Sequence, residues 1–278
     1  MSETPAARQV AIAVAPNGGR RTKADHAAIP MTSAELARTA AECLEAGAGM
    51  IHAHVRRPDG SHLLDADAYR DAIAAIRAEV ADRLVIQITT EALGIYSPAE
   101  QIAVLKAVRP EAASLALREL APDDSWEPAF ADVLTWMKWE NVLPQIILYD
   151  PSEAVRLAGM IRRGLVPWQD IPVLYVLGRY TVSQTSEPAD LLPFLAPDMP
   201  RFGNWSVCAF GRHEAACVTA AALLGGHIRV GFENNLLLPD GSHAGANAAL
   251  VETVANASQS LGLGLCDAAA IRSLFRPA

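Results

Sequence analysis

Two histidines separated by one residue, His52 and His54, lie near the end of an apolar stretch at residues 50–55. On a β-strand, side chains two positions apart point to the same face, so both imidazoles and Arg56 are expected on one face and the apolar side chains on the other. Two neutral imidazoles on one face can hold a divalent metal ion, most often Zn²⁺. The alternative is a pair of buried, hydrogen-bonded polar residues. We favour the metal, because paired neutral rings need a cation or a polar group between them.

A carboxylate that would complete such a site is Glu233, at the end of a later strand-like segment. Arg229 and Glu233 have the same parity along this segment, whereas the residues that alternate with them are apolar and would face away from the site. Two imidazoles, one carboxylate and an open position are the arrangement typical of a catalytic zinc site. The alternative for Glu233 is an ion pair with Arg229 or Arg56.

The elements that must position these residues alternate between strand and helix along the chain, which predicts parallel strands with right-handed crossovers. Eight strand–helix units predict an α/β fold, a (β/α)₈ TIM barrel, as a single domain over residues 1–278 with a C-terminal helical tail. The expected strands are 9–15, 50–55, 84–90, 112–117, 144–149, 172–177, 203–210 and 228–232. The expected helices are 32–46, opened by a Thr32–Glu35 capping box, then 65–79, 98–107, 126–140, 152–163, 189–195, 213–224, 244–261 and 267–275. The alternative, an open doubly wound sheet, requires a glycine-rich dinucleotide loop, and residues 16–19 lack its spacing.

In a TIM barrel the functional site lies at the carboxyl ends of the strands. Polar side chains of inward parity gather there: Gln87, Thr89, Glu91, Ser114, Arg118, Gln145, Tyr149, Ser206 and Cys208. The remaining histidines are weaker ligand candidates. His227 has the parity of Arg229 but begins its strand, at the wrong end, and the others are expected in solvated loops or a helix: His26, His62, His213 and His243.

Composition excludes several classes of function. A formal net charge of −8 disfavours a nucleic-acid surface, which requires a basic patch. No stretch of about 18 uncharged apolar residues predicts a membrane span. Residues 1–8 lack the apolar segment of a signal peptide, and the four cysteines are far apart, so a reducing cytoplasm is expected. The chain has three lysines, Lys23, Lys106 and Lys138, and none ends a strand, which disfavours a Schiff-base aldolase.

The chain also resembles the β-keto acid cleavage enzymes, typified by 3-keto-5-aminohexanoate cleavage enzyme. The matching stretches run from the first strand to the last long helix: Thr22-Lys23-Ala24-Asp25, Ile29-Pro30-Met31-Thr32, Glu45-Ala46-Gly47-Ala48, Ile51-His52-Ala53-His54-Val55-Arg56, Gly211-Arg212, the run from Gly225 to Asn235, and the run from Ala246 to Val251. The pairing of the His-x-His strand with an Arg-x-Gly-Phe-Glu strand is the most specific part of this resemblance.

The resemblance implies a (β/α)₈ barrel, often a homotetramer, with one zinc ion held by His52, His54 and Glu233. It implies a reaction that joins a β-keto acid to acetyl-CoA and releases acetoacetate and a new acyl-CoA. Zinc would act as a Lewis acid on the keto and carboxylate oxygens, and Arg229 would assist deprotonation of the α-carbon. Thr89 stands where the family places a hydroxyl that contacts the substrate.

Several positions depart from the family pattern. Asn234 stands where the family has an acid after the zinc-ligand glutamate, Gln145 replaces a glutamate, and Ala116 replaces an asparagine. Arg20 stands where the amino-substrate member holds an ammonium group with a glutamate. An arginine there would repel an ammonium and favour a carboxylate or neutral polar group, unless it is a solvated loop cation.

With Ser114, these positions give the substrate-binding candidates Arg20, Ser114, Gln145 and Asn234. The lost carboxylate would need a replacement, for which the sequence offers Glu91, Glu119 and Asp150. Two further functions stay open on the same residues. One is a metal-dependent lyase or aldolase that uses no CoA, and the other is a metal-binding barrel that has lost turnover.

Overall fold

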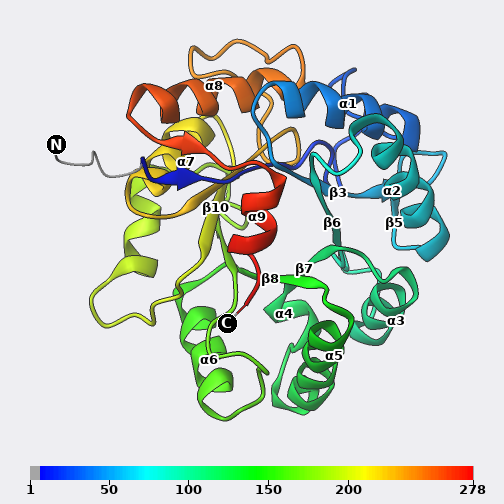
Figure 1. The fold of residues 1–278 in the computed structure, drawn as a ribbon, viewed down its shortest axis with the longest axis vertical. Coiled ribbons are helices and arrows are strands. Elements are labelled where there is room, and N and C mark those ends of the chain that lie inside the picture. The colour runs from blue at the N-terminus through cyan, green and yellow to red at the C-terminus, as the bar shows by residue number, and fades with distance from the viewer. Residues whose placement is uncertain (1–6, 278) are drawn as a thin grey trace, which may run out of the picture.

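The computed structural model describes residues 7–277, and its eight main strands close into a parallel barrel (Figure 1). The neighbours around the ring run in the order β10-β11-β2-β3-β6-β7-β8-β9. These strands are β2 (Ile12–Val14), β3 (Met50–Ala53), β6 (Val85–Thr89), β7 (Ala112–Ala116), β8 (Leu143–Leu148), β9 (Val173–Leu177), β10 (Trp205–Ala209) and β11 (His227–Val230). The predicted (β/α)₈ fold is therefore confirmed, and β3 and β11 both flank β2, as the metal hypothesis requires.

Helices follow the strands and cover the outside of the barrel (Figure 1). They are α1 (Ser33–Glu45), α2 (Ala66–Val80), α3 (Pro98–Val108), α5 (Glu127–Glu140), α6 (Pro151–Arg162), α7 (Glu214–Leu223) and α8 (Asn247–Ser260). The Thr32–Glu35 capping box is present at the start of α1. The helix expected at 189–195 is a 3₁₀ helix, η2 (Pro188–Leu195), because Pro193 inside it has no N–H to donate to an α-helical bond. Short α4 (Leu117–Leu120) and η1 (Asp124–Trp126) were not predicted.

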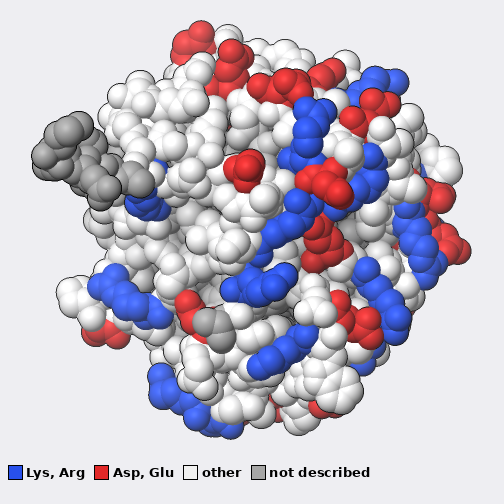
Figure 2. Space-filling view, in the orientation of Figure 1, with Lys and Arg blue, Asp and Glu red and all other residues white. Residues whose placement is uncertain are grey.

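The C-terminal helix α9 (Ala268–Leu274) closes the amino-terminal end of the barrel, near the centre of Figure 1. Ile271 and Phe275 pack with the first residues of four strands, Met50, Val85, Ala112 and Leu143, and with Ala11, which directly precedes β2. Arg272 and Arg77 both pair with Glu111, which ties α9 to α2 and to the start of β7. Basic and acidic side chains are interspersed over this face (Figure 2). The tail thus seals the end of the barrel opposite the predicted site.

Two of the expected strands are interrupted. The segment at 9–15 divides into β1 (Gln9–Val10), which pairs outside the barrel with β12 (Gly264–Leu265), and β2. The segment at 50–55 ends at Ala53, and β4 (Val55–Arg56) pairs instead with β5 (His62–Leu63). The Asn17 side chain causes this break, because it bonds the backbone N–H and C=O of His54 at 3.3 and 2.9 Å.

The prediction that Arg56 shares the face of the two histidines is therefore wrong. Its guanidinium donates to the backbone carbonyls of Asn17, Gly18, Gly60 and Arg21. Arg56 thereby fixes the loop after β2 in place instead of reaching the site. The expectation for residues 1–8 concerns a segment that lies mostly outside the described residues. No helix in the part of the chain that is described is long and apolar enough to cross a bilayer.

The chain reverses sharply after β11, and a glycine makes that turn possible. Gly231 has φ +142°, and a Cβ at this position would lie 2.3 Å from the carbonyl oxygen of Ala15. The same carbonyl accepts a hydrogen bond from the Glu233 N–H at 3.1 Å. Gly231 therefore lets the loop approach β2 closely enough to place Glu233.

We predict that Gly231→Ala lowers the thermal midpoint and weakens metal binding. A non-glycine residue held at positive φ costs about 1–3 kcal/mol, and the Cβ would also force the loop away from Ala15. Gly262→Ala is the matched control, since Gly262 has φ +83° but no heavy atom within 4 Å of its Cβ position. Differential scanning calorimetry should show a larger fall in the thermal midpoint for Gly231→Ala than for Gly262→Ala. Zinc titration should show weaker binding for Gly231→Ala alone. Equal losses for both variants would contradict this account.

Candidate metal and substrate site

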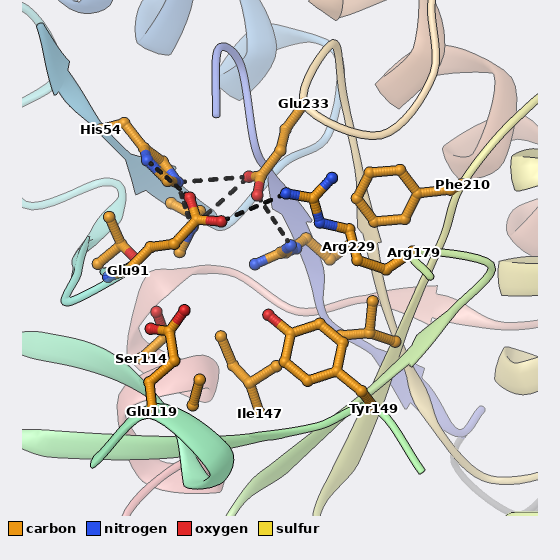
Figure 3. Close-up of a pocket in the computed structure, with 14 residues that line it drawn as sticks. His54, Glu91, Ser114, Glu119, Ile147, Tyr149, Arg179, Phe210, Arg229 and Glu233 are labelled. Carbon is orange, nitrogen blue, oxygen red and sulfur yellow. Dashed lines mark hydrogen bonds and ion pairs between the residues drawn. The ribbon is translucent and has the colours of Figure 1, made fainter. Parts of the chain in front are cut away.

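Three side chains converge at the carboxyl end of the barrel, and they are the three that the sequence suggests as ligands: His52, His54 and Glu233. Figure 3 shows His54 and Glu233 facing each other there. The Nε2 atoms of His52 and His54 lie 3.2 Å apart, and Glu233 Oε2 lies 3.6 Å from each of them. One ligand atom from each residue falls within 4.8 Å of the others. His52 comes from β3, His54 from the residue after it, and Glu233 from the turn after β11. This spacing is suited to a single metal ion.

The outer ring nitrogens of both histidines face acceptor groups. His52 Nδ1 lies 2.8 Å from the Gln87 Oε1, and His54 Nδ1 lies 3.7 Å from the Glu91 Oε2. A proton on Nδ1 leaves the Nε2 lone pair free for a metal, which is how outer-shell acceptors orient ligating histidines. Glu233 Oε2 is buried and has no hydrogen-bond partner among residues 7–277. A cation between this oxygen and the two Nε2 atoms would satisfy it, so the residues fit a metal.

The charges around the site favour ligand-competent protonation states. Burial lowers the pKa of His52 to about 3, with the Arg229 guanidinium adding to the effect, so the imidazole is neutral. Burial opposes ionisation of Glu233, but Arg229 and the two histidines hold the pKa of its carboxyl well below the usual range. Glu233 Oε1 lies 3.5 Å from Arg229 Nη2. The two hypotheses for Glu233, metal ligand and ion-pair partner, are thus served by different oxygens.

Arg229 is a permanent cation in this pocket. Although burial opposes its charge, neighbouring Cys208 and Glu233 raise its pKa above the ordinary value. Its Nε and Nη1 atoms are buried and have no hydrogen-bond partner within the described chain. These N–H groups are therefore free to donate to a bound anion, whereas the guanidinium cannot accept a proton at neutral pH.

The pocket beside the triad has a polar side and an apolar side (Figure 3). Thr89 and Ser114 line the polar side as predicted, and the Ser114 hydroxyl has no partner among the described residues. Ala116, Ile147, Val176 and Phe210 form the apolar wall across the pocket.

A second chamber opens beside the first and carries arginines. It is lined by the loop at residues 17–21, which includes Arg20, and it shares Glu91, Arg179 and Phe210 with the main pocket. Arg179 Nη2 lies 3.5 Å from Glu91 Oε1, so this pair stands between the two chambers. Arg20 is exposed at the mouth of this chamber and does not line the first one.

Gln145 and Asn234 lie outside the lining of both chambers. Gln145 sits one layer deeper in the barrel, where its Oε1 accepts a hydrogen bond from Gln87 and its Nε2 donates to Ser206 Oγ. This places Gln145 behind Gln87, which in turn faces His52. The Asn234 side chain is buried and donates to Glu214 at 3.3 Å. Both residues are thus placed to support the site from behind.

The candidate replacement carboxylates differ in position. Glu91 and Glu119 line the main pocket, and burial raises the pKa of Glu119, whose Oε2 accepts from the Ala92 N–H and from Gln101. Asp150 lies instead at the start of α6, where it caps the helix by accepting from the Ser152 N–H.

The expectation that His62 is solvated is wrong: it is 3 % exposed, and its ring lies 5.8 Å from that of His54.

Two residues of the site were missed in the sequence. Arg179 follows β9 in a loop with no motif around it. Glu214 begins α7 and is 1 % exposed, and burial raises the pKa of its carboxyl to about 8 against three hydrogen bonds that favour the charged form. An acid at a helix start is the common helix-dipole pattern, so the sequence gave no signal that this one points inward.

Comparison with known proteins identifies the family. The model for the beta-keto acid cleavage enzyme family matches residues 9–276. The chain belongs to the beta-keto acid cleavage enzyme family. It is 30% identical over 250 residues to a 3-keto-5-aminohexanoate cleavage enzyme of Fusobacterium nucleatum subsp. nucleatum, a match that covers 88% of this chain and 89% of that protein.

Other relatives of this family member extend the comparison. It is 28% identical over 277 residues to a 3-oxoadipate:acetyl-CoA acetyltransferase of Cupriavidus necator, covering 95% of this chain and 93% of that protein. Among solved structures, the complex of ObcA with oxaloacetate superposes with a TM-score of 0.69 at 17% identity, covering 89% of this chain and 67% of that one. That structural likeness shows the barrel fold alone.

We predict that the purified protein binds about one equivalent of zinc per chain and that His52→Ala, His54→Ala or Glu233→Gln each abolishes tight binding. Each change removes one of the three converging ligand atoms. His243→Ala is the control, because His243 is exposed and lies outside this cluster. Competition with a chromophoric chelator measures the affinity. Unchanged affinity in all three variants would contradict the metal site.

A pH dependence of stability follows from His227, at the far end of the barrel. Burial lowers its pKa to about 4, and its Nδ1 accepts a hydrogen bond from the Ala11 N–H at 3.2 Å, which requires the neutral ring. The unfolded chain takes up this proton near pH 6.5, before the folded chain does.

We therefore predict that this residue's contribution is complete above about pH 6.5 and is lost as the pH falls toward 4, at a slope approaching 1.4 kcal/mol per pH unit. His227→Asn keeps an acceptor but does not titrate, so the free energy of unfolding should fall less steeply in this window. Urea titrations at several pH values check this. Identical slopes for both proteins would refute it.

Proposed function

We propose that this protein is a zinc-dependent transferase that joins a β-keto acid to acetyl-CoA and yields acetoacetate and a new acyl-CoA. The observation that carries the proposal is the convergence of His52, His54 and Glu233 beside Arg229, in a pocket of a member of this family. Relatives named for acetyl-CoA-dependent transfer from several keto acids support the same reaction type.

Two imidazoles and one carboxylate are the ligand set of catalytic zinc sites, which supports Zn²⁺ over Mg²⁺ or Ca²⁺. When bound, the ion supplies Lewis-acid polarisation of the substrate's keto and carboxylate oxygens. Gln87 holds the His52 imidazole in the tautomer that presents Nε2, because its Oε1 lies 2.8 Å from His52 Nδ1. Glu91 Oε2 lies 3.7 Å from His54 Nδ1, too far for a hydrogen bond. Gln145 supports Gln87 from the layer below.

Arg229 acts as a fixed donor toward negative charge. Arg229 lines the pocket, and its Nε and Nη1 groups have no hydrogen-bond partner among residues 7–277. A guanidinium there would stabilise the negative charge of the enolate without accepting the proton. Glu91 is placed to accept the α-carbon proton, because it faces both chambers and its buried Oε2 has no partner within the described chain. Thr89 and Ser114 supply hydroxyl contacts to the substrate.

The residues that line the two chambers select the part of the keto acid beyond its keto and carboxylate groups. Arg20 and Arg21 line the second chamber together with Arg179, and this favours a keto acid whose distal end is a carboxylate or neutral polar group over one that carries an ammonium. The wall formed by Ala116, Ile147 and Val176 accepts the short apolar part next to the keto group. By resemblance to the family we further propose a homotetramer in the cytoplasm, with no nucleic-acid partner.

The test is a substrate panel. With zinc-loaded protein and acetyl-CoA labelled in its acetyl group, an active β-keto acid should give labelled acetoacetate and an unlabelled acyl-CoA. We expect dicarboxylic or neutral keto acids to be turned over faster than amino-substituted ones. Arg229→Gln should lower kcat by about 10²–10³-fold, whereas Arg38→Gln, at an exposed arginine outside the pocket, should not.

The outcomes separate the candidate functions. If the keto acid is cleaved at the same rate without acetyl-CoA, the protein is instead a CoA-independent lyase or aldolase. No product from any acid, with zinc bound, would instead support a metal-binding barrel that has lost turnover.

A further inference from the structure

Glu214 is a carboxylate buried outside the pocket, and the mechanism above does not use it. It is 1 % exposed, and a buried carboxylate is costly unless hydrogen bonds satisfy it. Its Oε1 accepts from the Gly231 N–H at 3.1 Å and from Asn234 Nδ2 at 3.3 Å, and its Oε2 accepts from Asn235 Nδ2 at 3.3 Å. All three donors belong to residues 231–235, the turn that carries Glu233.

Arg21 holds the same turn from another side. Its Nη1 donates to the Phe232 carbonyl at 2.7 Å, and its Nη2 reaches the Asn234 carbonyl at 3.4 Å. Burial lowers the pKa of Arg21, and Glu214 is the acidic group that opposes this most strongly. The turn is thus held between a buried carboxylate that receives its N–H groups and a cation that donates to its carbonyls.

The Glu233 side chain depends on this arrangement. The Glu233 N–H donates to the Ala15 carbonyl, and the Glu233 carboxyl projects toward the two histidines. A shift of the turn by a fraction of an ångström would move Glu233 Oε2 relative to both Nε2 atoms. Groups that orient a ligand typically change metal affinity by about 10–100-fold when they are removed.

We propose that Glu214 is a positioning residue that sets the metal affinity of the site by fixing the turn at residues 231–235. The proposal rests on the metal site proposed above and adds a residue that touches neither metal nor substrate. Its contact with Asn234 pairs one carboxylate with one amide at 3.3 Å. The same pair can be built in the opposite sense, with the amide on α7 and the carboxylate on the turn.

The experiment is a double-mutant cycle on this pair, made in the full chain. Glu214→Gln leaves one acceptor oxygen for the three donors of the turn, so at least one donor opposes its amide group, and Asn234→Asp brings two carboxylates into contact. The double variant Glu214→Gln/Asn234→Asp again pairs one carboxylate with one amide between positions 214 and 234, while the Gly231 N–H, which shares the Oε1 position, loses its acceptor. Zinc affinity is measured by competition with a chelator, and the thermal midpoint is measured on the metal-free protein.

We expect each single change to weaken zinc binding by about 10–100-fold and the double change to bind zinc more tightly than Asn234→Asp alone, because the pair between positions 214 and 234 is restored. Thr32→Ala, which removes the capping side chain of α1, is the control for stability: it should lower the thermal midpoint and leave zinc affinity unchanged.

The outcomes are separable. Zinc affinity in Glu214→Gln equal to that of the unaltered protein would overturn the proposal, as would a double variant no better than the weaker single one. If Asn234→Asp fails to fold, Glu214→Gln alone decides. If Glu214→Gln fails to fold, the comparison of Asn234→Asp with the double variant decides, and equal zinc affinity in those two would overturn the proposal. Absence of zinc binding by the unaltered protein would instead overturn the metal site on which the proposal rests.

Discussion

Burial of one carboxylate between one guanidinium and two imidazoles is the constraint on which the site depends. Glu233 faces Arg229 with one oxygen and both Nε2 atoms with the other. Burial alone would raise the pKa of the Glu233 carboxyl. Arg229 and the two histidines instead hold that pKa low, whereas burial, with a further contribution from Arg229, lowers the pKa of His52. Arg229 thus favours an anionic carboxylate ligand and a neutral imidazole ligand at the same time.

The sequence was sufficient where strand geometry is strict. The alternation of elements predicted the closed barrel that brings β3 and β11 to either side of β2. His52, His54, Arg229 and Glu233 meet as predicted, although His54 and Glu233 lie just beyond the ends of β3 and β11 and parity alone does not place them. The prediction from sequence failed where a loop side chain competes for the backbone hydrogen bonds of a strand. Asn17 takes both backbone groups of His54, so the strand ends there and Arg56 leaves the predicted face.

Sequence patterns do not show how deep in the barrel a side chain lies. Nor do they show which residues contact the site from loops or helices distant in sequence. Gln145 has inward parity and is paired in register with Ser114, yet Ser114 lines the pocket and Gln145 lies beneath it. Strands in a barrel are tilted and staggered, so register with a neighbour does not fix depth. Glu214 and Arg179 act through contacts with loops distant in sequence, and no local pattern records such contacts.

The two ends of the barrel differ: one is closed by apolar packing, and the other holds the polar pocket. At the amino-terminal end, α9 fills the barrel with apolar side chains and ion pairs hold it in place. At the other end, buried polar atoms without partners within the described chain collect around one pocket: His54 Nδ1, Glu91 Oε2, Ser114 Oγ, Arg229 Nε and Nη1, and Glu233 Oε2. Each such group costs about 1–3 kcal/mol if it stays unpaired. Because unpaired nitrogens and oxygens both face the same pocket, a cation together with a carboxylate-bearing substrate would satisfy them together, which neither would do alone. The unpaired atoms around this pocket therefore support the proposal of a metal ion and a keto acid bound there together.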